Sequence, residues 1–216
     1  MIDPNTMSST QQEPEQKIYI YHTGIAEDIL GPGKRLVVWT SGCPFNCKGC
    51  IEPGLHDLHA GEAWIPDQYH AQIRDALLCL AKITFSGGEP LFQAKPLLRL
   101  IQSFDPKPEL MLYTGYEKDE AHTLFPEVLA YVDILVAGPY LAGKAGSCLW
   151  RGSKNQTISS PSGVYSNKEL EPWLQAPSAG MEIHVRDAQL FIYGVPPQDA
   201  LQRVYSKLHS KGIEIS

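Results

Sequence analysis

The stretch RLVVWTSGCPFNCKGC, residues 35 to 50, runs from a β-rich segment directly into a loop with three cysteines. Cys43, Cys47 and Cys50 lie close together in a chain that has five cysteines in all. Three thiolates are one short of the four that close a structural zinc site or a fully protein-ligated iron–sulfur cluster. We therefore expect a metal centre whose fourth position is filled from elsewhere, as in a catalytic centre with an open position.

The other two cysteines are weaker candidates for the missing ligand. Cys79 lies in a segment with helical spacing, residues 66 to 81, where a free cysteine is expected to be a small buried hydrophobic residue. Cys148 lies in a Gly/Ser-rich loop, and a metal role for it stays open. His56, Asp57 and His59 form a further group of potential ligands, but their spacing matches no closed metal site. We therefore expect them to lie in a solvated loop.

Composition limits the class of protein. With 216 residues, of which 43% are hydrophobic, the chain has enough apolar material for one main domain. It has no apolar run of the roughly 18 residues that a membrane span needs, and its first residues lack the pattern of a secretory signal. The formal net charge of −6 gives no general attraction to nucleic acid or anionic lipid. We expect a cytoplasmic protein with neither a membrane nor a nucleic-acid partner.

Alternating strands and helices predict an α/β fold. Period-2 and β-rich runs predict strands at 17–23, 35–41, 109–114 and 132–137, with a further short strand in ITFSGGEP (83–90) that ends in glycines, and helical spacing predicts helices at 66–81, 93–103 and 117–130. Strands joined by helices pair in parallel, and ligands bind beyond the carboxyl ends of such strands. The cysteine loop, SGGEP (86–90), TGY (114–116) and AGP (137–139) all fall at those ends.

The sequence predicts that the chain has three parts. Residues 1–16 are polar and are expected to form a disordered tail. Residues 17–158 form the core domain, and 159–216 form a C-terminal linker and a small ββαβ appendage, in which RDAQ (186–189) turns a hairpin. His184 alternates with Ile183 and Val185 in the first strand of that hairpin, and we expect it to face outward.

CPFNCKGC (43–50) and SGGEP together resemble the two fingerprints of the radical S-adenosylmethionine (SAM) superfamily. The second begins 36 residues after the last cysteine of the first. The resemblance implies a partial, incomplete parallel β/α barrel and a 4Fe-4S cluster on Cys43, Cys47 and Cys50. It also implies that the amino and carboxylate groups of SAM fill the fourth iron position.

Longer stretches resemble the small activating proteins of anaerobic ribonucleotide reductase. These are ILGPGKRLVVWTSGCPFNCKGCIEPGLHD, ITFSGGEPLFQAKPL, YTGY and WRGSKNQTI, spread over residues 17 to 158. In most of the superfamily the residue before the third cysteine is aromatic and lies by the adenine. The glycine at this position, Gly49, is typical of the activating proteins.

The resemblance also implies roles for individual residues. Gly87 and Gly88 are expected to let the backbone approach the SAM ammonium closely, and Glu89 to neutralise positive charge or fix its loop. Further residues expected at the SAM site are Ser86, Thr114, Arg151 (to the SAM carboxylate), Ser153 and Asn155, with Asn155 and Gln156 as candidates for the ribose or adenine.

Three functions remain in competition at this stage. The first is a radical SAM enzyme that cleaves SAM to a 5′-deoxyadenosyl radical and takes a hydrogen atom from a glycine of a glycyl radical enzyme, with flavodoxin or ferredoxin as electron donor. The second is a radical SAM enzyme that modifies a peptide or a small metabolite. The third is a noncatalytic electron-transfer module, which would have no need of SGGEP or WRGSKNQ.

Overall fold

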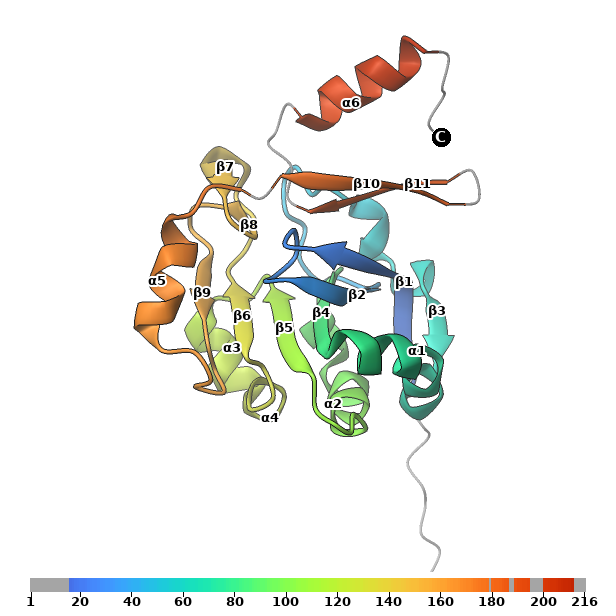
Figure 1. Cartoon of the computed structure of the whole chain (residues 1–216), viewed down its shortest axis with the longest axis vertical. Coiled ribbons are helices and arrows are strands. Elements are labelled where there is room, and N and C mark those ends of the chain that lie inside the picture. The colour runs from blue at the N-terminus through green and yellow to red at the C-terminus, as the bar shows by residue number, and fades with distance from the viewer. Residues whose placement is uncertain (1–15, 179, 187–188, 195–199, 212–216) are drawn as a thin grey trace, which may run out of the picture.

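The computed structural model of the chain describes residues 16–178, 180–186, 189–194 and 200–211. A seven-stranded sheet forms its centre (Figure 1), with the strand order β3-β1-β2-β4-β5-β6-β9. Its strands are β1 (Ile18–Glu27), β2 (Lys34–Thr40), β3 (Glu62–Trp64), β4 (Lys82–Gly87), β5 (Glu109–Thr114), β6 (Ile134–Ala137) and β9 (Thr157–Ser159). Two further pairs are β7 (Ala145–Cys148) with β8 (Arg151–Ser153), and β10 (Met181–Arg186) with β11 (Gln189–Gly194).

The four central strands are parallel. β2 pairs with β4, β4 with β5 and β5 with β6, whereas β1, β3 and β9 join the sheet in antiparallel fashion. The prediction of a mixed α/β fold with a largely parallel sheet is thus confirmed. Closure of this sheet toward a partial barrel stays a prediction.

Helices cover one face of the sheet. The helices are α1 (Pro66–Leu80), α2 (Ala94–Gln102), α3 (Lys118–Leu124), α4 (Pro126–Leu129), α5 (Asn167–Gln175) and α6 (Ala200–His209), with short 3-10 turns at Pro53–His56, Leu58–Ala60, Pro90–Gln93 and Ala142–Lys144. Apolar residues of α1 to α4 pack on alternate residues of the central strands, such as Phe85, Leu112 and Leu135. Alternate strand residues point to opposite faces, so the neighbours of these residues face away from the helices.

The helix predicted over 117–130 is interrupted. α3 ends at Leu124 and α4 begins at Pro126, with Phe125 between them at φ −131° and ψ 44°. Proline has no backbone N–H and disfavours helical geometry in the residue before it. The prediction of one continuous helix was therefore wrong at this position.

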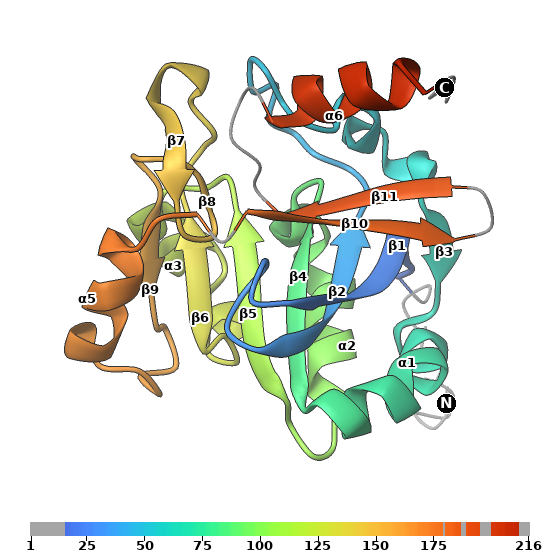
Figure 2. The same cartoon turned by 45° about the horizontal axis from the view of Figure 1, so that its top comes forward.

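The other face of the sheet, here called the second face, is covered by C-terminal segments. Figures 1 and 2 show the hairpin β10–β11 crossing over β1 and β2. The Tyr193 hydroxyl lies 2.7 Å from Nε2 of His22, and the Tyr193 ring centroid lies 4.6 Å from that of Trp39. Gly24 makes room for this contact, because a Cβ there would lie 2.2 Å from the Tyr193 hydroxyl oxygen. The hairpin therefore packs on the strand that leads into the cysteine loop.

The predicted C-terminal hairpin and helix are present, but one side-chain prediction was wrong. Ile183 and Val185 are 47% and 72% exposed, whereas His184 stacks on Tyr193 at 4.4 Å and bonds Glu182 at 2.9 Å. His184 therefore faces the sheet rather than outward. The last strand of the predicted appendage and residues 1–15 of the predicted tail lie outside the described residues. In the described part of the chain, no helix is both long enough and apolar enough to span a membrane.

Candidate functional site

The cysteine loop follows directly on β2 and is hydrogen-bonded to the segment that comes after it. The backbone N–H of Gly42 donates to the carbonyl of Leu55 at 2.9 Å, and that of Cys43 donates to the carbonyl of His56 at 3.2 Å. Gly42 has φ +82°, a conformation that side chains disfavour. The entrance of the loop is thus fixed by the backbone of the 3-10 turn at 53–56.

All three cysteines of the loop are partly exposed. The N–H of Cys50 donates to the carbonyl of Cys47 at 3.1 Å, which turns the loop back on itself. Burial raises the pKa of the Cys43 thiol to about 11, and hydrogen bonding with the backbone of Phe45 offsets this only in part. Metals bind the thiolate, so a metal centre here has to displace that proton.

The three thiols of the cysteine loop are the kind of donor that an iron–sulfur cluster takes. Within the residues that the structure describes, no group of three or more His, Cys, Asp or Glu side chains could hold a metal ion. A four-iron cluster is larger than one ion, and each cysteine binds a different iron, so its ligands stand farther apart. Three thiol donors on one partly exposed loop fit that requirement.

SGGEP lies directly against the cysteine loop. The N–H of Gly88 donates to the carbonyl of Thr40 at 2.7 Å, and the N–H of Glu89 donates to the carbonyl of Gly42 at 2.9 Å. A Cβ on Gly88 would lie 2.5 Å from the Gly42 carbonyl oxygen, and one on Gly87 would lie 2.4 Å from the Thr40 carbonyl oxygen. Both positions therefore have to be glycine, because any side chain there would collide with the backbone of Thr40 and Gly42.

Glu89 joins the loop after β4 to the end of β5. Its side chain is buried, with 1% of its surface exposed. One carboxylate oxygen accepts from the Leu91 N–H at 2.9 Å and the Thr114 hydroxyl at 2.9 Å, and the other accepts from the Gly115 N–H at 2.7 Å. Burial raises the pKa of Glu89 to about 7, and these hydrogen bonds lower it only in part. Of its two expected roles, the contacts favour fixing the loop.

Two other residues expected at the SAM site lie at the same edge of the sheet. Thr114 is buried, and its hydroxyl is occupied by Glu89 and by the N–H of Tyr116 at 3.2 Å. Ser86 is partly exposed, and its carbonyl accepts from the Thr40 hydroxyl at 3.3 Å. Ser86 therefore keeps a side chain at the surface of the site, whereas Thr114 does not.

The WRGSKNQ element bonds mainly to backbone. The buried guanidinium of Arg151 donates to the carbonyls of Gln156 and Leu174, at 3.3 and 2.6 Å. Ser153 accepts from the Leu141 N–H at 3.1 Å through its hydroxyl. In the loop after β6, the carbonyl of Pro139 accepts from Asn155 at 2.8 Å and that of Gly138 accepts from Gln156 at 2.8 Å. Ser153, Asn155 and Gln156 thus hold that loop in place, and Arg151 ties the element to α5.

Residues outside this edge have other surroundings. Cys79 is exposed, so the prediction that it is buried was wrong; it lies on the water-facing side of α1. Cys148 is buried in the β7–β8 pair. Asp57 caps the N–H of His59 at 2.9 Å, and the His59 ring contacts Tyr19 edge-on at 5.3 Å. This group forms a capped turn, in line with the loop expected from the sequence.

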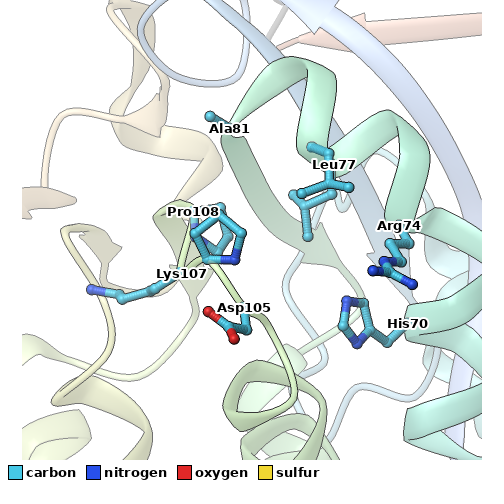
Figure 3. A pocket seen from close by; sticks show the side chains of 9 residues that line it. His70, Arg74, Leu77, Ala81, Asp105, Lys107 and Pro108 are labelled. Carbon is cyan, nitrogen blue, oxygen red and sulfur yellow. The ribbon is translucent and has the colours of Figure 1, made fainter.

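A small cavity of about 40 Å³ lies at the other end of the sheet (Figure 3). It is lined by the end of α1, with His70, Arg74 and Leu77, and by the loop 105–108 that leads into β5. The cysteine loop and SGGEP lie beyond the carboxyl ends of β2 and β4, whereas this cavity lies at the amino ends of β4 and β5. It is not part of the candidate site.

Comparison with known proteins gives a family match over this region. Residues 29–159 match the family model of the 4Fe-4S single cluster domain. The match contains the cysteine loop, SGGEP and WRGSKNQ, and it ends before α5.

Curated relatives carry one name, anaerobic ribonucleoside-triphosphate reductase-activating protein. The Vibrio cholerae protein is 32% identical over 148 residues, covering 64% of this chain and 96% of the relative. The Escherichia coli K12 protein is 30% identical with the same coverage, and the phage T4 protein is 28% identical over 150 residues, 64% of this chain and 92% of its own. Roughly a third of this chain therefore has no counterpart in relatives that are matched almost end to end.

The contact between Gly88 and Gly42 gives a first prediction. Gly88→Ala is expected to lower the free energy of unfolding by about 2 kcal/mol, because the new Cβ meets backbone that cannot move without shifting the cysteine loop. It is also expected to lower the iron bound after anaerobic reconstitution. Urea unfolding and iron analysis measure both effects. Gly143→Ala is the control, since nothing lies within 4 Å of its added Cβ; equal results for the two variants would contradict the account.

Glu89 gives a prediction about pH in the cluster-free protein. The folded pKa of about 7 lies above the ordinary value of 4.5, so folding favours the protonated carboxyl. The stability that this group contributes is full below pH 4.5 and is lost as the pH rises through about 7. The difference in unfolding free energy between the unsubstituted protein and Glu89→Gln is expected to fall by about 3 kcal/mol from pH 4.5 to pH 8. A difference that stays constant over this range in urea unfolding would refute the shift.

Proposed function

The chain belongs to the 4Fe-4S single cluster domain family, together with the anaerobic ribonucleoside-triphosphate reductase-activating proteins, and from this premise we propose that it is a radical SAM enzyme that activates a glycyl radical enzyme. Its cofactors are a 4Fe-4S cluster on Cys43, Cys47 and Cys50, and SAM. The core, residues 17–158, is proposed to form the partial β/α barrel of such enzymes, with 159–216 as a C-terminal addition.

One observation carries the proposal, namely the backbone contact between SGGEP and the cysteine loop. Hydrogen bonds from Gly88 and Glu89 to Thr40 and Gly42 make the two segments one site. A cluster-binding loop for electron transfer alone needs no second segment held against it. A site that binds a cosubstrate beside the cluster does, since both parts of the cosubstrate have to be positioned at once.

The chain's own residues have separate roles in this proposal. The cysteine thiolates hold the cluster, which when bound supplies the electron that cleaves SAM to methionine and a 5′-deoxyadenosyl radical. The backbone of Gly49, Gly87 and Gly88 and the side chain of Ser86 border the SAM site. Glu89 and Thr114 fix the loop, because they bond one another and adjacent N–H groups. A flavodoxin or ferredoxin is the proposed electron donor.

We assign Arg151 and Ser153 an indirect role at the SAM site, whereas Asn155 bonds backbone through Nδ2 and keeps Oδ1 unpaired among the described residues. The hydrogen bonds of the first two to backbone groups support this, since Arg151 already binds two carbonyls and Ser153 already accepts from Leu141. Ser153 and Asn155 hold the loop after β6 in place, whereas Arg151 ties WRGSKNQ to α5 through the carbonyl of Leu174.

The surface around the cysteine loop supports a protein partner. Three large apolar side chains stand exposed there: Ile51 at 61%, Phe92 at 50% and Leu141 at 40%. Ile51 follows the last cysteine, and the Phe92 ring lies 3.0 Å from where a Cβ on Gly42 would be. Exposed apolar groups around a site mark a surface that a second protein covers. The name of the relatives indicates the kind of partner, an anaerobic ribonucleoside-triphosphate reductase.

A second candidate function is a radical SAM enzyme that acts on a peptide or a small metabolite. The observation that favours it is the hairpin β10–β11, which covers the second face beside Trp39, four residues before Cys43. This hairpin follows the segment matched by the family model. A hairpin in this position suits a site that is enclosed on one side and takes a substrate smaller than a protein.

Cleavage of SAM tests the proposal. After reconstitution with iron and sulfide under argon, the protein is expected to form 5′-deoxyadenosine from SAM and dithionite, as measured by chromatography. Cys43→Ala is expected to reduce the yield at least 100-fold, because the cluster loses a ligand. Cys79→Ala is the matched control and is expected to keep full yield, since Cys79 is exposed on α1. No product from a protein with full iron content would contradict the proposal and favour the electron-transfer function.

The partner is tested with an anaerobic ribonucleoside-triphosphate reductase as the protein to be activated. Ile51→Ser is expected to lower the yield of glycyl radical in that reductase by about 10-fold, measured by electron paramagnetic resonance, because it removes apolar contact area. Formation of 5′-deoxyadenosine without the reductase is expected to stay unchanged. Leu78→Ser is the control, since Leu78 is 51% exposed on α1, away from the loop. If the reductase never gains a radical while SAM is cleaved, the second candidate function is favoured.

A further inference from the structure

An aromatic ring from another part of the chain fills the space beside Gly49. Gly49 has no side chain, and its φ of +78° would be strained for a residue that has one. A Cβ built on Gly49 would lie 3.7 Å from Cε1 of Tyr140 and 3.6 Å from Cβ of Ala142. These are ordinary contact distances. The loop after β6 therefore packs against the cysteine loop next to Cys50.

The Tyr140 ring is supported on its other side as well. A Cβ on Gly152, in β8, would lie 3.0 Å from Cδ2 of Tyr140, so the ring rests closely on the Gly152 backbone. Gly152 in turn donates its N–H to Oε1 of Gln156 at 2.7 Å. The ring is held between two glycines from different segments, yet the residue remains partly exposed.

Hydrogen bonds fix the loop that bears the ring. Gln156 donates through Nε2 to the carbonyl of Gly138 at 2.8 Å, and Asn155 donates through Nδ2 to the carbonyl of Pro139 at 2.8 Å. The Leu141 N–H donates to the Ser153 hydroxyl at 3.1 Å. Each residue on either side of Tyr140 is thus tied to WRGSKNQ. A ring held this firmly loses little conformational freedom when it binds a ligand.

A buried polar atom nearby lacks a partner. Oδ1 of Asn155 is buried and has no hydrogen-bond partner among the residues that the structure describes. Buried acceptors are nearly always satisfied, so an unpaired one indicates a missing donor. This oxygen belongs to the side chain that holds Pro139, the residue before Tyr140. A ligand with an amino group on a flat ring would supply the donor and the stacking surface together.

We propose that Tyr140 is the residue that stacks on the adenine of SAM, an inference that rests on the proposed function. The adenine is the flat, amino-bearing end of SAM, and aromatic side chains stack on bases. The amino and carboxylate groups at the other end of SAM are expected to fill the fourth iron position, which leaves the adenine as the part for a side chain to bind. Because the ring reaches the site from the loop after β6, WRGSKNQ acts on SAM through Tyr140.

Binding measurements on the cluster-loaded protein without reductant test this role, so that no turnover is needed. Tyr140→Leu keeps an apolar side chain between the two glycines but removes the ring, and is expected to weaken SAM binding by 10-fold or more in calorimetry. Tyr140→Ala is expected to weaken it at least as much. Tyr140→Phe keeps the ring and is expected to stay within about 3-fold. Tyr205→Ala, at an exposed tyrosine of α6, is the matched control.

Free methionine separates adenine stacking from general damage to the site, because it lacks the adenine. Its affinity is expected to be equal in Tyr140→Leu and the unsubstituted protein, and iron content by chemical analysis is expected to be equal too. Unchanged SAM affinity in Tyr140→Leu overturns the inference, and so does a parallel loss of methionine affinity. If the unsubstituted, iron-loaded protein binds no SAM at all, the proposed function fails together with the inference.

Discussion

The close approach of two backbone segments, the end of β2 and the turn after β4, is the constraint on which the rest of the site depends. Gly88 donates to Thr40 and Glu89 donates to Gly42, and no side chain fits between them at Gly87 or Gly88. Parallel pairing of β2 with β4 brings the two strand ends to the same edge. The cysteine loop is therefore positioned by a neighbouring strand as well as by its own sequence, which suits a loop that has to hold a large cofactor.

From this contact the site extends along the sheet edge through successive loops. Glu89 ties the turn after β4 to the end of β5, and Gln156 and Asn155 tie WRGSKNQ to the loop after β6. That loop returns to the cysteine loop through Tyr140 and Gly49. Glu89, Asn155 and Gln156 thus serve mainly to connect one loop to the next. Backbone and partly exposed side chains are left to face the cosubstrate. The C-terminal hairpin supports the same edge from the second face, through Trp39.

Much of this could be predicted from the sequence, because its signals are local. Apolar periodicity gave the strands and most helices, and the positions of CPFNCKGC and SGGEP at strand ends implied one site. The orientation of His184 could not be predicted, because the apolar Ile183 and Val185 face water while His184 stacks on Tyr193. The contact between Tyr140 and Gly49 could not be predicted either. It joins segments about ninety residues apart, and the ring lies beside a glycine, whose lack of a side chain gives no pattern in the sequence. Such contacts depend on tertiary packing, which periodicity does not encode.

Electron paramagnetic resonance of the dithionite-reduced, reconstituted protein, recorded with and without SAM, tests the central claim most directly. The claim is that the cysteine loop and SGGEP form one site in which SAM meets the cluster. SAM is expected to shift the cluster signal in the unsubstituted protein, and this shift is expected to be lost in Gly88→Ala even in the fraction that retains the cluster. A cluster signal that is identical with and without saturating SAM would contradict the claim.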